Sequence, residues 1–476
     1  MDSLNASVLN RFPPIDEGQA DVLLAGELAR DRHKLVVLDD DPTGTQTVHN
    51  VSVYTGWDIE SIRAGFAEDS RLFFILTNSR AMTKHQTAAV HREIARTVAA
   101  VSRECDMPYL ILSRSDSTLR GHYPLETEVL REELEADGAA VDGEVLVPFF
   151  REGGRFTVNN VHYVLQGDAL IPAAQTEFAE DKTFGYTHSA LPEYIEEKTN
   201  GAYRASDVTC ISLDSLRAMD IDGVEAQLMA VRDFGKVCVN AVDVCDLKVF
   251  CIALYRAMAK GKRFLFRTAA GLVKVMGGVS DRPLLTYRDM VVRETARGGV
   301  VVVGSHTQKT TAQLNELLKL PCVVPVEFDS DKVLDGDEAF SAEVDRCVRA
   351  EEEIIRSGKN SVCYTRRALL TLENDTKESA LLRSVKISDG VQSLIARLSV
   401  TPAFVIAKGG ITSSDVGVKA LQVKRATVMG QIRPGIPVWQ TGPESRFPQT
   451  PYVIFPGNTG SETTLRETVD ILTGKA

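Results

Sequence analysis

Several features that would assign this 476-residue chain to a familiar class of protein are missing from its sequence. No stretch reaches the roughly 18 consecutive apolar residues that a membrane span needs. The amino terminus has no basic region followed by an apolar segment. The eight cysteines include no C-x-x-C pair and no histidine at ligand spacing. We therefore expect a cytoplasmic protein with no membrane association, no disulfide framework and no cysteine-bound metal.

An excess of positive charge is also missing. The chain carries 54 Lys and Arg residues against 65 Asp and Glu residues, which gives a net charge of -11. This balance argues against a broad nucleic-acid surface and against adhesion to an anionic membrane. With 44% hydrophobic residues the chain can bury a large core, and we expect two domains.

Two common nucleotide-binding signatures are absent. The sequence contains no G-x-x-x-x-G-K-[ST] segment and no G-x-G-x-x-G that opens a βαβ unit. Neither a Walker loop nor a dinucleotide fingerprint is predicted.

Apolar β-like runs alternate with helical segments along the chain. This alternation predicts an α/β fold of two domains, each with a mostly parallel sheet flanked by helices. We place a lead segment with one amphipathic helix at 1–33, a first domain at 34–290 and a second domain at 291–476. The boundary falls near the charged, aperiodic segment 282–298.

Three consecutive carboxylates, Asp39, Asp40 and Asp41, follow directly on the apolar run 35–38. They would lie at the carboxyl end of a buried strand, where open α/β sheets bind ligands. Their mutual repulsion has to be offset by a cation, a basic side chain or a hydrogen-bonding substrate. The alternative is an acidic turn in which one Asp caps the next element.

Two later segments of the first domain combine arginines with other polar groups. Segment 113–124 carries Arg114, Asp116, Ser117 and Arg120, and segment 148–163 carries Arg155 and His162. Arginine can hold a carboxylate or phosphate through two parallel hydrogen bonds. An ion pair that pins a loop and a plain surface hairpin are the respective alternatives. Because both segments follow strands of one predicted sheet, we expect them at the same edge as the acids.

The second domain repeats one design three times, at 299–319, 401–421 and 451–472. In each, a strand stops at glycine with Ser, Thr or Asn nearby, and a helix begins within a few residues. Glycines let backbone N–H groups approach a ligand, and the helix start carries a partial positive charge. One such loop is usually only a connection. Three of them favour a phosphate site.

Taken together, these motifs resemble the four-carbon acid sugar kinase family, from about residue 34 to 470. The resemblance rests on DDDPTGTQ, SRSDSTLRGHYP, GGRFTVNNVHYV, AAQTEFAEDKTFGY, GSHT, KGGIT and PGNTG, in this order. It implies a sugar-acid-binding first domain, an ATP-binding second domain and an active site in the cleft between them. It also implies Mg²⁺ as cofactor, a homodimer, and phosphorylation of the terminal C4 hydroxyl of threonate, erythronate or 3-oxo-tetronate.

The resemblance carries over to individual residues. The catalytic candidates are Asp40, Asp41 and Arg120, with one of the two acids accepting the proton of the hydroxyl. The substrate-binding candidates are Thr43, Gly44, Arg114, Asp116, Ser117, Arg155 and His162. The nucleotide-binding candidates are Ser305, Lys408, Gly409, Gly410, Ile411, Thr412, Gly457, Asn458 and Gly460. No residue is assigned as a metal ligand.

Three positions depart from the family's usual pattern. Ile411 stands where many members have an acid, which weakens any role for a carboxylate of that loop in holding metal or ribose. Arg114 stands where many have Lys, which keeps the charge and changes its geometry. Pro42 replaces an apolar residue and fixes the turn more tightly. We interpret these departures as marks of a subgroup with its own substrate.

Two other functions compete with the kinase. Asp39, Asp41 and Thr43 after an apolar strand also fit the D-x-D-x-T start of haloacid-dehalogenase-like phosphatases, with Asp39 as nucleophile and Asp41 as acid and base. A non-catalytic sensor of a sugar acid or nucleotide is the second alternative. The glycine loops and arginine clusters argue against the phosphatase, and the acid cluster argues against the sensor.

Overall fold

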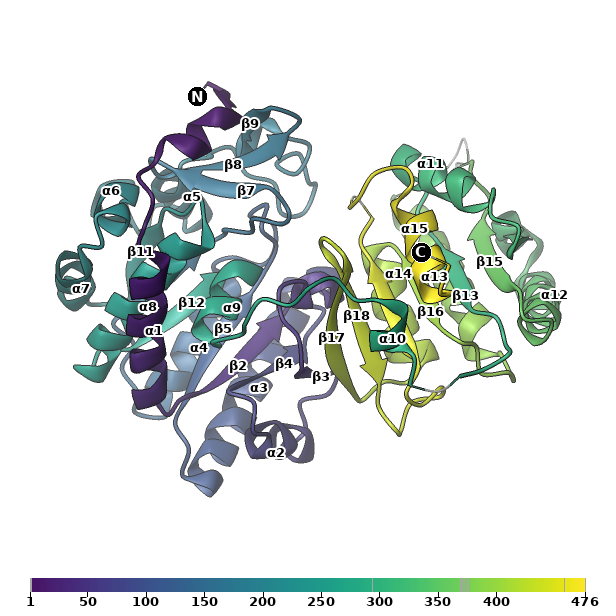
Figure 1. Ribbon diagram of the computed structural model, residues 1–476, viewed down its shortest axis with the longest axis horizontal. Helices are drawn as coiled ribbons and strands as arrows, with labels where there is room; N and C mark the ends of the chain where they lie inside the picture. The colour runs from purple at the N-terminus through teal and green to yellow at the C-terminus, as the bar shows by residue number, and fades with distance from the viewer. Residues whose placement is uncertain are drawn as a thin grey trace. The chain divides into compact units, whose positions relative to one another are not determined.

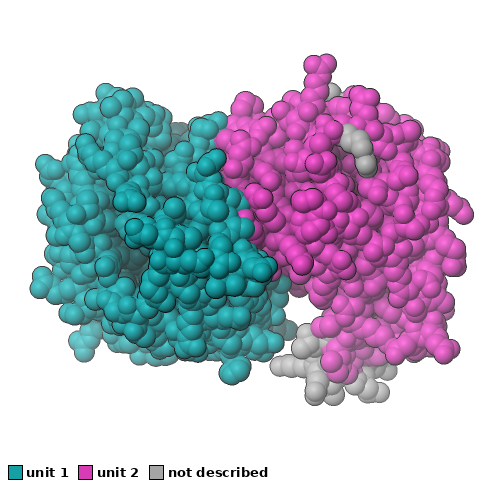
Figure 2. All heavy atoms as spheres, turned by 90° about the horizontal axis from the view of Figure 1, so that it is seen from below, with its two compact units in different colours: residues 1–44, 56–281 teal, residues 45–55, 282–476 magenta. Residues whose placement is uncertain are grey.

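The computed structural model describes residues 2–292, 294–368, 370, 372, 375, 377–457 and 459–475. The chain forms two compact units. Unit 1 comprises residues 1–44 and 56–281, and unit 2 comprises residues 45–55 and 282–476 (Figure 2). Residues 45–55 thus pack with unit 2, although the sequence places them within the first domain.

Unit 1 is built on a parallel sheet (Figure 1). The order of its strands is β10 (Thr209–Ile211), β11 (Gly235–Val239), β6 (Gly143–Val147), β12 (Phe264–Thr268), β5 (Tyr109–Arg114), β2 (Lys34–Asp39) and β4 (Leu72–Leu76). All neighbouring pairs in this part of the chain are parallel. Residues 35–38 of β2 are buried, because helices cover both faces of a parallel sheet.

The helices of unit 1 form two groups. The contacts of α8 (Val244–Ala259) group it with α1 (Glu17–Arg30), α6 (Leu213–Arg217), α7 (Ile221–Ala230) and α9 (Ala270–Met276). The second group is α2 (Ile59–Ala67), α3 (Lys84–Cys105) and α4 (Leu125–Ala136). The crossovers through α3 and α4 run opposite to the one through α8, so the right-handed rule places the two groups on opposite faces.

A smaller antiparallel sheet belongs to unit 1. Its order is β1 (Leu4–Asn5), β9 (Ala169–Pro172), β8 (Val161–Gln166) and β7 (Arg155–Val158). The segment 148–163 therefore contains the β7–β8 hairpin, which was the alternative interpretation of this segment. The hairpin also carries the candidate substrate-binding residues Arg155 and His162. Helix α5 (Leu191–Lys198) follows this sheet.

Unit 2 holds a mixed sheet. Its order is β3 (Val51–Tyr54), β17 (Arg425–Arg433), β18 (Ile436–Thr441), β19 (Pro451–Phe455), β16 (Val405–Lys408), β13 (Val300–Val303), β15 (Asn360–Thr365) and β14 (Val323–Phe328). The last five are parallel, and the first three form antiparallel pairs. Apolar residues of β13, β16 and β19 form the centre of its core.

Helices also cover both faces of this second sheet. Helix α15 (Thr464–Leu472) contacts both α10 (Tyr287–Met290) and α11 (Gln308–Leu317). The other group is α12 (Asp337–Arg356), α13 (Lys377–Ala396) and α14 (Gly410–Asp415). The chain leaves β13 toward β14 on one side and later reaches β16 on its other side. Ligands of α/β sheets bind where the strand order reverses in this way. The prediction of two α/β domains with mostly parallel, helix-flanked sheets is confirmed.

Candidate functional site

The three acids at the end of β2 differ sharply in their surroundings. Asp39 and Asp40 are only 1% and 2% exposed, whereas Asp41 is partly exposed. Asp41 Oδ1 accepts a hydrogen bond from the backbone N–H of Thr43 at 2.8 Å. Its Oδ2 lies 3.7 Å from the guanidinium of Arg80. Of the three carboxylates, Asp41 is therefore the one with room for a ligand.

Asp40 is held by side chains from the segments that follow the neighbouring strands β4 and β5. Arg80 donates to both of its oxygens, at 2.7 and 3.3 Å, and the Ser115 hydroxyl donates at 2.7 Å. Burial alone would raise the pKa of Asp40, but Arg80, Arg114 and Arg267 outweigh it and lower the pKa below its usual value. Asp40 is thus a charged anchor whose bonding capacity is largely used inside the protein.

Asp39 lies deepest of the three. Arg114 Nη1 donates to its Oδ1 at 3.0 Å, and its Oδ2 has no partner among the described residues. Burial raises the pKa of Asp39 to about 7 against the opposing effect of Arg114. A Cβ atom at Gly44 would collide with this carboxylate, so only glycine lets the turn close over it. Asp39 and Arg114 are both buried and form an ion pair beneath this turn.

Arg80 is a candidate that our reading of the sequence missed. It lies just after β4 and is close to three carboxylates, those of Asp40, Asp41 and Asp116. Burial disfavours the charged guanidinium, but these acids raise its pKa well above the usual value. The signal was present in the sequence, since TNSRAM follows a strand just as the acids do.

In the loop after β5, two side chains donate hydrogen bonds to the carboxylate of Asp116. Asp116 accepts hydrogen bonds from the Thr118 hydroxyl and from Arg120 Nε, the latter at 2.7 Å. Burial would raise the pKa of Asp116, but Arg120 and Arg80 hold it well below its usual range. The structure thus contains the Arg–Asp ion pair within this loop that was the alternative interpretation of the segment. Ser117 is buried and offers its backbone carbonyl to His162.

Arg155 presents a guanidinium with unused hydrogen-bonding capacity. It begins β7, and its Nε is buried without a partner among the described residues. Its Cζ lies 5.6 Å from the ring centre of Phe178, and Arg120 Cζ lies 5.1 Å from the same ring. Burial lowers the pKa of Arg155, and nearby Asp116 opposes the shift. An anionic ligand would satisfy this group.

His162 is fully enclosed. Its Nε2 lies 2.7 Å from the backbone carbonyl oxygen of Ser117, and its Nδ1 lies 3.0 Å from the Thr157 hydroxyl. Burial lowers the pKa of His162 to about 4, so the ring is neutral at pH 7. Both nitrogens are used, and the ring is suited to fixing the loop after β5, not to contacting a substrate directly.

In unit 2, three polar loops follow three adjacent parallel strands. In the sheet register Val303 of β13 pairs with Lys408 of β16, and Lys408 pairs with Phe455 of β19. The residues that come next, Gly304, Gly409 and Pro456, therefore start their loops side by side. The sequence predicted three loops of one design, and the structure brings them together at one sheet edge.

Backbone conformation and close packing explain why glycine occurs at two positions of these loops. Gly409 has φ of +119°, which other residues rarely adopt, and its N–H donates to the carbonyl of Phe455 at 2.9 Å. A Cβ atom at Gly304 would lie 2.6 Å from Thr412 Oγ1, so the first two loops are in close contact. A Cβ atom at Gly457 would meet nothing within 4 Å. The side of Gly457 on which a Cβ atom would lie is therefore open among the described residues.

Lys408 is buried beneath the third loop. Its Nζ donates to the carbonyls of Pro456 and Gly457 at 2.7 and 2.9 Å and lies 4.6 Å from the ring centre of Phe455. Burial, assisted by the charge of Lys309, lowers its pKa to about 7. The ammonium thus shapes the loop at 456–457 and has no exposed surface for a phosphate.

The remaining candidates of unit 2 lie around these loops. Ser305 is partly exposed, Gly410 begins α14, Ile411 is 69% exposed and Gly460 is exposed with φ of +80°. Asn458 lies outside the described residues. Arg367, which our sequence reading missed, follows β15 and donates to the carbonyl of Ser305 and to Thr311 Oγ1. Its Nη1 has no partner among the described residues.

A protein cage for a metal ion is not found among the described residues, since no three His, Cys, Asp or Glu side chains gather for that purpose. Magnesium is usually bound through one or two carboxylates together with substrate phosphates. The partly exposed carboxylate of Asp41 fits that pattern. Across the described part of the chain, no helix is long and apolar enough to cross a membrane.

Two domain families match the chain. The sugar-binding N-terminal domain family matches residues 35–276, and the nucleotide-binding C-terminal domain family matches residues 300–465. The first match contains the acid and arginine clusters, and the second contains the three glycine loops. No curated protein matched the chain.

Solved structures share the fold over nearly the whole length. A Salmonella typhimurium LT2 protein described as a possible tRNA synthase has a TM-score of 0.66 at 16% identity, with 90% of this chain and 97% of that chain covered. A Haemophilus influenzae protein assigned to the DUF1537 family has a TM-score of 0.58 at 17% identity, with 91% and 99% covered. At such identities the likeness shows the fold alone.

Proposed function

The chain belongs to the family that joins a sugar-binding N-terminal domain to a nucleotide-binding C-terminal domain, the architecture of four-carbon acid sugar kinases, and we propose that it is an ATP-dependent sugar-acid kinase. It transfers the γ-phosphoryl group of ATP to the terminal C4 hydroxyl of an acid such as threonate, erythronate or 3-oxo-tetronate. The products are ADP and the 4-phosphate of the acid.

The main support for this proposal is the difference in exposure among the three acids. Asp39 and Asp40 are enclosed and paired with Arg114 and Arg80, whereas Asp41 is partly exposed beside the same arginine. Phosphoryl transfer needs a carboxylate that orients the attacking hydroxyl and accepts its proton. Asp41 is our candidate for that role, and Asp40 holds Arg80 in place.

The carboxylate of the substrate binds to Arg155 and Arg120. Arg155 has a buried nitrogen without a partner among the described residues, and both guanidiniums lie near the ring of Phe178. Arginine binds carboxylates through parallel hydrogen bonds, which orients the ligand as well as retaining it. His162, Ser117, Thr43, Gly44 and Arg114 support this site by fixing its loops.

The phosphates of ATP bind to the glycine loops after β13, β16 and β19. Backbone N–H groups of these loops and the partly exposed Ser305 hydroxyl are the donors. Arg367, whose Nη1 has no partner among the described residues, supplies positive charge. Lys408 shapes the third loop from beneath. Mg²⁺ bound together with ATP would neutralise the phosphate charge.

The two alternatives account for less of the structure. A phosphatase of the haloacid-dehalogenase type needs Asp39 as nucleophile, but Asp39 lies beneath Gly44 and is only 1% exposed. A sensor without catalysis would bind the same ligands and form no product. Turnover distinguishes it from a kinase.

The test is an assay of the purified protein with Mg-ATP and a panel of four-carbon sugar acids. Phosphorus NMR should detect a phosphomonoester together with ADP for at least one acid. The proposal is wrong if no acid gives a product and ATP neither binds to nor stabilises the protein. Binding of both ligands without any product would support the sensor instead.

A further inference from the structure

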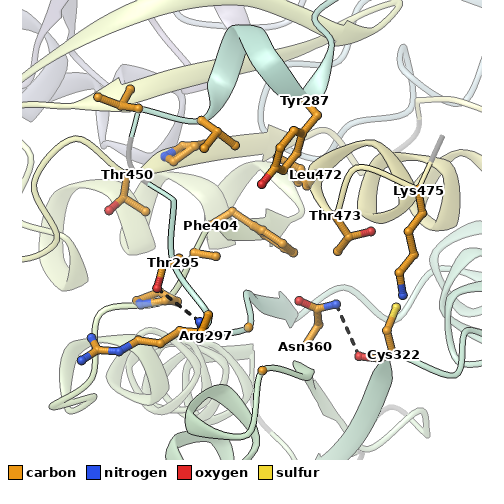
Figure 3. Close-up of a pocket in the computed structure, with 18 of the residues that line it drawn as sticks. Tyr287, Thr295, Arg297, Cys322, Asn360, Phe404, Thr450, Leu472, Thr473 and Lys475 are labelled. Carbon is orange, nitrogen blue, oxygen red and sulfur yellow. Dashed lines mark hydrogen bonds between the residues drawn. The ribbon is translucent and has the colours of Figure 1, made fainter.

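Unit 2 contains a pocket that the proposed kinase reaction does not use (Figure 3). Its volume is about 240 Å³. The residues that line it precede or begin the parallel strands β13, β14, β15, β16 and β19, or belong to α10, to the segment after it and to the end of α15. The glycine loops leave the opposite, carboxyl ends of β13, β16 and β19. The pocket is therefore separate from the proposed nucleotide site.

Apolar side chains form part of the pocket wall and extend to the surface, next to polar side chains such as Asn360 and Thr450. Phe404 and Leu472 are 2% and 5% exposed and belong to the core of unit 2. Tyr287 and Val292 also line it, yet they are 36% and 50% exposed. Large apolar side chains exposed next to a concavity are typical of ligand sites.

The charged side chains that line the pocket are basic. Arg297 and Lys475 lie on opposite sides of it in Figure 3, and no Asp or Glu is among the described lining residues. Arg297 donates a hydrogen bond from its side chain to the carbonyl of Thr401 at 3.3 Å, and no other hydrogen bond of its guanidinium is found among the described residues. Asn360, by contrast, is used within the wall, where it binds Gly299 N–H and the carbonyl of Cys322.

We propose that this pocket binds a small organic anion with an apolar body, such as an aromatic carboxylate. The apolar body packs against Phe404, Leu472 and Tyr287, and the anionic group is attracted by Arg297 and Lys475. Burial of the apolar body against these three side chains contributes affinity, and the two cations supply the preference for an anion. The proposal does not depend on the kinase function.

A cysteine in the pocket wall makes ligand binding measurable. Cys322 lines it and is partly exposed, whereas Cys105 is exposed in unit 1 and serves as an internal reference. We would measure the rate of iodoacetamide labelling at each thiol by mass spectrometry, with benzoate as the probe and neutral benzamide as its control. Benzoate should slow the labelling of Cys322 and leave Cys105 unaffected. Saturating ATP should not remove this protection.

Variants test which features are responsible. Arg297→Gln and Lys475→Gln change exposed residues, and each should raise the benzoate concentration needed for half-protection about fivefold. Thr295→Trp adds bulk at an exposed lining position and should abolish protection. Calorimetric titration of the same proteins with benzoate gives an independent readout that needs no thiol.

The proposal is overturned if benzoate neither protects Cys322 nor binds in the titration. It is also overturned if benzamide protects as well as benzoate, because the cations would then have no role. Equal protection in Thr295→Trp, or displacement of benzoate by ATP, would place the binding elsewhere.

Discussion

The candidate ligand sites of the two units lie at sheet edges that differ in the groups they offer to an anion. In unit 1 the edge consists of charged side chains, with Arg80, Arg114 and Arg120 each paired to a carboxylate. In unit 2 the corresponding edge consists of glycine loops, and the lysine in their midst is buried and turned toward backbone carbonyls. Both edges lie at the carboxyl ends of parallel strands, and we propose that both hold an anionic ligand.

This difference between side-chain and backbone groups predicts which substitutions each sheet edge should tolerate. Where side-chain charge binds the ligand, loss of one charge removes the interaction, even if the backbone stays in place. Where backbone N–H groups bind the ligand, backbone conformation is decisive, and a single methyl group in the wrong place can disturb it. Four predictions follow this contrast, from the largest expected effect to the smallest.

Asp41→Asn should lower kcat about 1000-fold, because a general base of this kind contributes about that much. Stability should change little, since an amide oxygen can still accept the Thr43 N–H. Steady-state kinetics and thermal unfolding measure the two effects.

Asp39→Asn is the control for this prediction. It preserves shape at a buried position and should retain far more activity than Asp41→Asn. The reverse order of activities would favour the phosphatase and contradict our assignment of the base.

Arg155→Gln should raise the KM for the sugar acid about 50-fold, because a charge-assisted pair with the substrate carboxylate is lost. The KM for ATP should not change. Arg151→Gln is the matched control, since Arg151 is exposed on the same loop and pairs with Asp243 at 3.0 Å. An equal effect of both variants on KM would show that Arg155 makes no specific contact.

Stability should depend on pH through His162. Its pKa is lowered to about 4 in the folded protein and is about 6.5 when unfolded, so the unfolded state binds more protons between these values. Stability is therefore lost as pH falls through this window, by about 2 kcal/mol between about pH 8 and about pH 5. Urea unfolding at the two pH values measures this loss.

His162→Gln provides the comparison, because glutamine can form hydrogen bonds but does not titrate. Its stability should fall by about 2 kcal/mol less than that of the wild type over the same pH interval. A variant that loses as much stability as the wild type would exclude His162 as the source.

Gly409→Ala should weaken ATP binding about tenfold, because alanine disfavours φ of +119° by about 1–3 kcal/mol and shifts the loop. Gly336→Ala is the matched control. Gly336 has φ of +98°, a Cβ atom there would meet no described atom within 4 Å, and the residue caps the start of α12 and is not part of a glycine loop. Both variants should lose stability, but only Gly409→Ala should lose ATP affinity in a calorimetric titration. Unchanged affinity in Gly409→Ala would show that this loop does not hold the nucleotide.

Much of the fold was predictable because its strands are buried on both faces. The apolar runs 35–38, 109–112 and 237–239 lie within the strands β2, β5 and β11. The small sheet formed by β1 and β7 to β9 was harder to predict, because its short strands pair antiparallel and β1 pairs with a segment more than 150 residues away. The excursion of residues 45–55 into unit 2 depends on the pairing of β3 with β17, and no local pattern announces that pairing.

The candidate site was predictable as a set of loops and less so as a set of contacts. Arg80 and Arg367 were missed, although each follows a strand as the predicted residues do. Arg267 was also missed, and the signal was a charge within the apolar run of β12, where its side chain bonds Glu126. Lys408 and His162 were predicted to bind ligands. Both side chains are buried; Lys408 Nζ donates to two backbone carbonyls, and His162 lies between the Ser117 carbonyl and the Thr157 hydroxyl, contacts that the sequence did not indicate.

The sequence by itself determined the alternation of strands and helices and the positions of the acids, arginines and glycine loops, because these depend on local hydrophobic pattern and on backbone chemistry. Only the tertiary structure decided which strands are neighbours, and with that which residues meet. It enclosed Asp39 and Asp40 and left Asp41 partly exposed, although the three are adjacent in sequence. The physical reason is that burial and charge pairing depend on residues from other strands, which the local sequence does not specify.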